Sequence, residues 1–196
     1  MRDIRAKIEE LDLVANDPKA KNLVAEIEKI LQTVPAKGEP KRKVIIFSEY
    51  TDTVKHLEPS LEKAFKGKVV STSSGLSASQ LKEILANFDA SVKPQKQEND
   101  FQILLTSDKL SEGVNLNRAG AIINYDIPWN PTRVIQRVGR INRIGKKVFQ
   151  SLYIYNFFPT EQGADIVKSR EIASQKMFLI HNTLGEDAKI FSVDEM

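Results

Sequence analysis

Short apolar runs alternate with amphipathic stretches along most of the chain. Runs in which apolar residues follow one another or alternate with polar ones predict strands at 44–47, 69–71, 101–106, 121–125 and 149–157. Stretches in which apolar residues recur at helical spacing predict helices at 51–65, 77–88 and 131–143. The first, third and fourth strands are short and apolar, which suits a parallel sheet covered on both faces. The alternation of strands and helices therefore predicts an α/β domain.

Helical patterns also flank this alternating region. A weak pattern covers 4–13, and a second helix is expected at 19–31, because Asp17-Pro18 is typical of a cap followed by a first turn. A linker follows at 35–40, and another helical pattern runs from 160 to 180. These patterns predict three parts: an N-terminal helical segment and linker at 1–40, the α/β domain at 41–158, and a C-terminal helical extension at 159–196.

Three local features sharpen the predicted elements. The sequence from Ser77 to Gln80 is typical of a capping box, and Asn130-Pro131 is typical of a helix start. Pro59 lies inside the predicted helix at 51–65, so that helix either kinks there or breaks after its first turn. The polar stretch 91–100 predicts a mobile surface loop, which is a candidate insertion.

Composition excludes several classes of protein. The chain has no cysteine and only two histidines, His56 and His181, so we expect neither disulfides nor a metal centre. No run is long and apolar enough to span a bilayer, and the first residues lack the apolar stretch of a secretory signal. We therefore expect a cytoplasmic protein without a membrane partner.

Charge is concentrated in one segment, although the net charge is only +3. Six basic residues and no acidic one lie in 133–147: Arg133, Arg137, Arg140, Arg143, Lys146 and Lys147. On a helix, one stripe would carry Arg133, Gln136, Arg140 and Arg143, and the opposite side would carry Val134, Val138 and Ile141. Clustered guanidinium groups repel one another, which favours a phosphate-bearing partner. Spacing alone, however, favours an ordinary solvated basic face.

The chain contains no phosphate-binding loop of the Gly-x4-Gly-Lys-Ser/Thr type. Gly67-Lys68 and Gly145-Lys146 both lack the rest of that pattern. Nucleotide chemistry at the basic helix would therefore need a phosphate cradle from another domain.

Four segments together resemble the motifs of superfamily-2 helicases, in the right order. Residues 136–143 (QRVGRINR) resemble motif VI, and residues 104–116 (LLTSDKLSEGVNL) resemble motif V. Residues 43–48 (KVIIFS) resemble motif IV, and residues 124–131 (NYDIPWNP) are similar to the D-x-x-W-N-P element of Swi/Snf-type ATPases. Within that group the chain is most similar to bacterial RNA-polymerase-associated ATPases. The resemblance implies the second RecA-like lobe of a motor, with a parallel sheet between helices.

The resemblance also implies a nucleotide site shared with a first lobe that holds ATP and Mg²⁺. Arg143 would be the arginine finger, Arg140 a second γ-phosphate contact, and Gln136 a polar partner of the nucleotide or the opposing lobe. Gly139 removes a side chain beside these groups and so permits close approach. Two further residues, Gly113 and Asn115, would lie beside the ribose and the interlobe cleft.

Other motif residues would contact the nucleic-acid backbone. Thr106 would meet a phosphate of the tracked strand, although it could equally just end a strand. Ser48 and the turn from Ser73 to Gly75 are further backbone-contact candidates. For Trp129 we expect a packing anchor, with base stacking as the alternative.

The predicted function is the second motor lobe of an ATP-dependent translocase or helicase, which is an enzyme only at full length and inactive as an ATPase alone. The expected partners are the N-terminal RecA-like lobe, double-stranded DNA, and RNA polymerase or another protein–DNA complex. Two alternatives remain: a nucleic-acid- or protein-binding module without ATPase function, and the motor of a restriction or phage-defence system. The segment after Asn156 has only a loose likeness to the brace of Swi/Snf-type lobes, which leaves the coupling to a remodelling task open.

Overall fold

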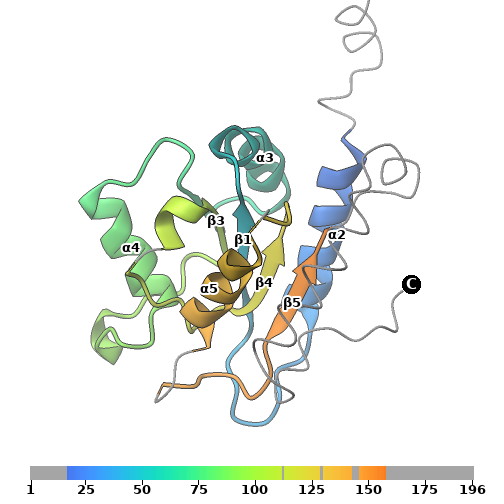
Figure 1. Cartoon of the computed structure of the whole chain (residues 1–196). Coiled ribbons are helices and arrows are strands. Elements are labelled where there is room, and N and C mark those ends of the chain that lie inside the picture. The colour runs from blue at the N-terminus through green and yellow to red at the C-terminus, as the bar shows by residue number, and fades with distance from the viewer. Residues whose placement is uncertain (1–16, 112, 129, 143–145, 158–196) are drawn as a thin grey trace, which may run out of the picture.

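The computed structural model describes residues 17–111, 113–128, 130–142 and 146–157, and these form one layered α/β unit (Figure 1). Within these ranges, five parallel strands form a sheet in the order β2-β3-β1-β4-β5. The strands are β1 (Lys43–Ser48), β2 (Val69–Ser71), β3 (Ile103–Ser107), β4 (Gly120–Asn124) and β5 (Tyr153–Asn156). The predicted parallel sheet is confirmed. The helices predicted at 4–13 and 160–180 lie outside the described residues.

Helices cover both faces of the sheet, because the central strands are apolar on both sides. On one face α2 (Pro18–Gln32) and α3 (Thr51–Ala64) pack against a core that includes Val44 and Ile46. On the other, α4 (Ala78–Phe88) and α5 (Pro131–Ile141) pack against a core that includes Ile45 and Phe47. Two short 3-10 helices, η1 (Pro94–Lys96) and η2 (Asp108–Ser111), lie before and after β3. The α2 helix thus shares a core with the sheet, while the proposed division of the chain at residue 40 stays a prediction.

The helix starts follow the predicted signals, with one difference. Asp17 Oδ1 accepts from Lys19 N at 2.8 Å and caps α2. Ser77 Oγ accepts from Gln80 N at 3.1 Å and caps α4, but the Gln80 side chain does not complete the capping box. Its Nε2 donates instead to Ser71 O at 2.7 Å, which ties the start of α4 to the end of β2.

The structure tests two local expectations, the effect of Pro59 on its helix and the surface loop at 91–100. Pro59 lies inside a continuous α3, which excludes the break, one of the two predicted alternatives, while the kink stays a prediction. Burial of the Val54, Leu57 and Leu61 face on both sides of the proline offsets the one helical hydrogen bond that proline removes. The exposed loop at 91–100 is held to α4, since Glu98 N donates to Ala86 O at 2.9 Å. Its mobility stays a prediction.

The edge strand β5 is shorter than predicted. The sequence predicted a strand at 149–157, and the structure has one only at Tyr153–Asn156. Phe149 is buried but lies outside the strand, where its ring packs over the start of β4. Arg42 Nη1 donates to Gly120 O at 2.9 Å and to Ser151 O at 2.8 Å. Side-chain contacts rather than sheet hydrogen bonds therefore hold this segment.

Gly120 should tolerate no side chain. It has φ +82°, and an added Cβ would lie 2.9 Å from the Phe149 ring. We expect Gly120→Ala to lower the free energy of unfolding by about 3 kcal/mol, from left-handed strain together with overpacking. Gly38→Ala is the matched control, because Gly38 has φ +87° with open space around it. Chemical denaturation measures both, and equal losses would show that the ring contact carries no cost.

A buried lysine begins β1. Lys43 Nζ donates to Asn87 O at 2.7 Å and lies 5.1 Å from the centre of the Phe88 ring. Burial and repulsion from Arg118 lower the pKa of Lys43 from 10.5 to about 8, and Asp100 opposes this shift. The folded chain therefore binds fewer protons than the unfolded chain between these two values.

This shift predicts a pH dependence of stability. Because the unfolded chain is the more protonated state, the free energy of unfolding should rise as the pH increases above about 8. Burial and the nearby carboxylates of Asp17 and Asp126 raise the pKa of Tyr125, which opposes the rise above pH 10.0. Urea denaturation between about pH 8 and pH 10.0 should show a smaller rise of the free energy of unfolding in Lys43→Met than in the parent. Lys55→Met, which changes an exposed lysine, should show the same rise as the parent. Parallel profiles for Lys43→Met and the parent would refute this role of Lys43.

Candidate functional site

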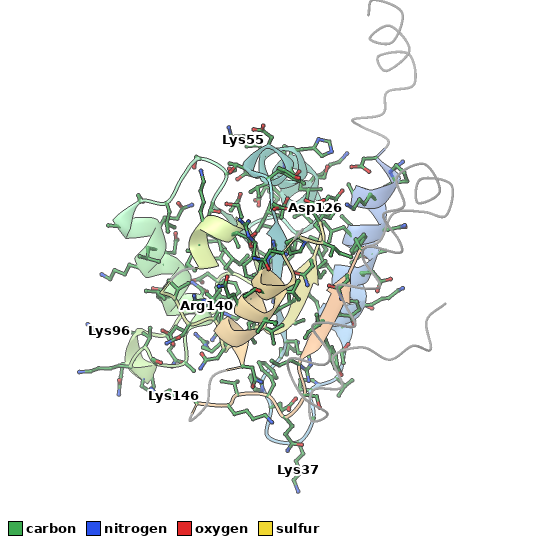
Figure 2. The ribbon with its side chains drawn as sticks, in the orientation of Figure 1. Lys37, Lys55, Lys96, Asp126, Arg140 and Lys146 are labelled. Carbon is green, nitrogen blue, oxygen red and sulfur yellow. The ribbon has the colours of Figure 1, made fainter. Side chains whose placement is uncertain are left out.

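The candidate site lies at the carboxyl edge of the sheet, where parallel strands all end on the same side. β1 ends at Ser48, β3 at Ser107 and β4 at Asn124, and each is followed closely by a carboxylate: Glu49, Asp108 and Asp126. The α5 helix begins beyond β4 and packs against this region and against η2. Figure 2 labels Asp126 at this edge and Arg140 farther along α5. The edge therefore brings the three motif segments next to the predicted arginine helix.

Arg137 holds α5 on this edge. Its side chain is 0% exposed, and Nε and Nη2 donate to the two Asp108 carboxylate oxygens at 2.6 Å and 2.9 Å. Nη1 donates to Asn124 Oδ1 at 2.8 Å, and the guanidinium lies 5.1 Å from the centre of the Phe47 ring. A bidentate arginine–carboxylate pair fixes both distance and orientation. Arg137 is thus a structural clamp between α5, η2 and β4.

Asp108 also binds a second arginine, which corrects part of the sequence argument. Arg133 Nη1 lies 3.2 Å from Asp108 Oδ2 and 3.6 Å from Glu49 Oε1. The expectation that the clustered arginines need an external phosphate is therefore wrong for Arg133 and Arg137, because carboxylates of this chain supply the anion. The apolar side of the helix is confirmed, since Val134, Val138 and Ile141 are all buried.

Arg140 differs from these two arginines. Its side chain is half-buried, and its Nε is fully buried without a hydrogen-bond partner among the described residues. Beside it, a Cβ at Gly139 would meet nothing within 4 Å, so packing inside the described lobe does not require this glycine. Gln136 is exposed one turn earlier on the same helix. Arg143 lies outside the described residues.

The structure brings the motif V segment next to Arg140. Leu116 N donates to Arg140 O at 2.9 Å, which joins the end of α5 to the segment between η2 and β4. Gly113 has φ +84° and is exposed, and Asn115 is half-buried within the same segment. Gly113, Asn115 and Arg140, which were predicted to lie near the nucleotide, are therefore in one region of the lobe.

The predicted phosphate-contacting hydroxyls are already engaged within the chain. Thr106 is buried, and its Oγ1 lies 2.9 Å from Thr72 Oγ1 and donates to Ser107 O at 3.1 Å. Ser48 Oγ donates to Asp126 Oδ2 at 2.5 Å. These hydrogen bonds engage the hydroxyl of Thr106, the penultimate residue of β3, and that of Ser48, the last residue of β1. A phosphate contact through either hydroxyl would require an internal partner to be exchanged.

The turn after β2 also has a predicted contact residue, Ser73, that is hydrogen-bonded within the chain. Ser73 Oγ donates to Glu58 Oε2 on α3 at 2.6 Å, and Ser73 N donates to Ser71 Oγ at 3.2 Å. Gly75 is exposed with φ +105°, a conformation that favours glycine. The turn is thus anchored through Ser73 and open at Gly75. Trp129 lies outside the described residues, so its role stays a prediction.

Sequence reasoning missed the acidic and amide side chains that organise this edge. Asp108, Asn124 and Asp126 lie within the quoted motifs, but they were not assigned roles. The available signal was their position, because polar residues that end apolar parallel strands converge at one edge. In the described ranges no group of three or more histidines, cysteines, aspartates or glutamates is suited to a metal ion. Nor do those ranges contain a helix of the length and apolarity that crossing a membrane requires.

Comparison with known proteins places the chain in a family. The helicase conserved C-terminal domain family matches residues 22–145. The chain is 29% identical over 84% of its length to the ATP-dependent helicase YqhH of Bacillus subtilis, where it spans 27% of that protein. It is 30% identical over 80% of its length to the DNA repair and recombination protein RAD54B of Mus musculus, spanning 17% of it. It is 28% identical over 68% of its length to the RNA polymerase-associated protein RapA of Vibrio cholerae, spanning 13% of it.

Solved structures confirm the fold. The C-terminal part of the Fun30 ATPase domain superposes with a TM-score of 0.55 and 22% identity, covering 86% of this chain and 48% of that one. Dbp5 of S. cerevisiae, bound to RNA and ADP BeF3, superposes with a TM-score of 0.56 and 18% identity, covering 84% of this chain and 36% of that one. The RecA-like fold and the Swi/Snf-like resemblance of the motifs are confirmed. The chain belongs to the helicase conserved C-terminal domain family.

Proposed function

We propose that the chain is the second motor lobe of an ATP-dependent nucleic-acid translocase or helicase. The observation that carries this proposal is Arg140, whose Nε is buried without a partner among the described residues. A buried donor without a hydrogen bond costs about 1–3 kcal/mol, so a movement of the Arg140 side chain that brings its guanidinium to an external acceptor would be favoured. The open space at Gly139 allows such a group to approach α5 closely.

The acceptor that fits is the γ-phosphate of ATP, held with Mg²⁺ by a first lobe. Arg137 and Asp108 set the position of α5, so that Arg140 is pre-positioned when the lobes close. Arg143, three residues farther on, would supply the arginine finger, and Gln136 a polar contact. Gly113 and Asn115 would border the same site, since Leu116 N is bonded to Arg140 O. The lobe would be inactive alone, because the sequence has no phosphate-binding loop.

We propose double-stranded DNA as the substrate, with RNA polymerase or another protein–DNA complex as a further partner in the cytoplasm. The names of RAD54B and RapA support this choice, although Dbp5, whose solved structure holds RNA, shares the fold. At this edge the exposed Gly75 turn would contact the nucleic-acid backbone, together with Ser73 in the same turn, Thr106, which is hydrogen-bonded to Thr72 just before that turn, and Ser48 at the end of β1. The proposal is tested by ATP hydrolysis in the full-length protein carrying Arg140→Ala, which should lose most of its activity.

A further inference from the structure

We propose that Lys19, in the first turn of α2, is a positioning residue for the arginine helix α5. This inference rests on the proposed motor function and adds to it a residue outside the helicase motifs. Lys19 Nζ lies 3.2 Å from Asp126 Oδ1 and 3.9 Å from the centre of the Tyr125 ring. Both partners directly follow β4. The start of α2 is therefore attached to the carboxyl edge of the sheet, close to the labelled Asp126 in Figure 2.

Asp126 joins Lys19 to the end of β1. Its second carboxylate oxygen, Oδ2, accepts from Ser48 Oγ at 2.5 Å, and its side chain is only 23% exposed. Ser48 Oγ in turn accepts from Tyr50 N at 3.2 Å, at the residue before α3. A single carboxylate thus connects α2 with the end of β1 and the start of α3. If Lys19 were replaced, the Asp126 carboxylate would keep the hydrogen bond from Ser48 Oγ and lose the ammonium group of Lys19.

Asp126 also joins Lys19 to α5. Arg137 Nη1 donates to the Asp126 backbone oxygen at 3.5 Å as well as to Asn124 Oδ1 at 2.8 Å. The loop after β4 is therefore held by Lys19 through the Asp126 side chain and holds Arg137 through the Asp126 backbone. A displacement of this loop would shift Arg137 and, one turn later on α5, Arg140. Small displacements of positioned groups can cost as much as about 10²-fold in rate.

Two further contacts hold the same turn of α2. Asp17, the cap of α2, lies 3.1 Å from His56 Nε2, and Tyr125 Oη lies 3.5 Å from Asp17 Oδ2. These contacts keep α2 docked when Lys19 is replaced. The Lys19 side chain is 40% exposed, and partly exposed ion pairs contribute little to stability. The inference therefore predicts a change in catalysis that is larger than the change in stability.

The test uses three variants of the full-length protein with nucleic acid at saturation. We expect Lys19→Met to lower kcat for ATP hydrolysis about 5-fold, with KM for ATP within about 2-fold of the parent. Lys19→Arg, which keeps the charge, should restore most of kcat. Lys29→Met is the matched control, because Lys29 is 70% exposed and pairs with Glu26 on the same helix. The melting temperature of Lys19→Met should fall by less than about 4 °C. An unchanged kcat in Lys19→Met, or an equal loss in Lys29→Met, would overturn the inference.

Hydrogen exchange in the 196-residue chain tests the same connection without ATP hydrolysis. The amides of α5 should exchange about 5-fold faster in Lys19→Met, while the amides of α4 stay unchanged. Equal exchange of α5 in Lys19→Met and the parent would overturn the inference, whatever the ATPase result. If Arg140→Ala leaves ATP hydrolysis intact, the motor proposal fails, and faster α5 exchange would still support Lys19 as a positioning residue.

Discussion

Arg137→Met should lower the free energy of unfolding of the chain by about 3 kcal/mol or more. Arg137 is 0% exposed and donates to both oxygens of Asp108, so its removal leaves a largely buried carboxylate with one charged partner fewer. Breaking a buried pair on one side typically costs about 3–5 kcal/mol. Urea denaturation followed by circular dichroism measures the loss.

Arg133→Met is the matched control, because Arg133 binds the same carboxylate from the surface. Its side chain is 46% exposed, and its Nη1 lies 3.2 Å from Asp108 Oδ2. Exposed pairs contribute about 0–1 kcal/mol, so we expect a small loss. Similar losses in the two variants would mean that burial of Arg137 does not set its contribution, and the clamp assigned to it would be wrong.

The fold could be predicted because burial on both faces leaves a clear pattern in the sequence. The strands predicted at 44–47 and 121–125 begin and end within one residue of the observed ends of β1 and β4. Strand β5 was less predictable, since it is an edge strand and only half-buried. Its neighbour Phe149 continues the apolar pattern while packing against Gly120, so the pattern overestimated the strand.

The site could be predicted in outline but not in its internal bonding. A helical projection separates the stripe that begins at Arg133 and Gln136 from Val134, Val138 and Ile141. The structure confirms that these apolar residues are buried while Arg133 and Gln136 are exposed, and Arg143 lies outside the described residues. The projection places Arg137 beside Arg133, yet the side chain turns inward because Asp108, 29 residues earlier, lies under it. Such a partner depends on tertiary packing, and helical spacing carries no signal for it.

Arg140→Ala tests the proposed nucleotide contact at small expected cost to the fold. Its backbone oxygen still accepts from Leu116 N in the variant, and the substitution removes a buried Nε that has no partner among the described residues. The free energy of unfolding should therefore change by about 1 kcal/mol or less. Catalysis should change far more, because loss of one donor to a transition-state oxygen typically costs about 10²- to 10³-fold.

The control for a general loss of positive charge is Lys147→Ala. Lys147 is exposed and belongs to the same basic segment. We expect this variant to keep kcat within about 2-fold of the parent, because screened surface charges act weakly at physiological salt. A similar fall in both variants would assign the effect to overall charge rather than to Arg140.

The most direct measurement is kcat for ATP hydrolysis by the full-length protein, with nucleic acid at saturation, in the parent and in Arg140→Ala. If Arg140 contacts the transferring phosphate, kcat falls by about 10²-fold or more while the melting curve is preserved. A folded Arg140→Ala protein with kcat within about 3-fold of the parent would contradict the assignment of this lobe's arginine helix to ATP hydrolysis.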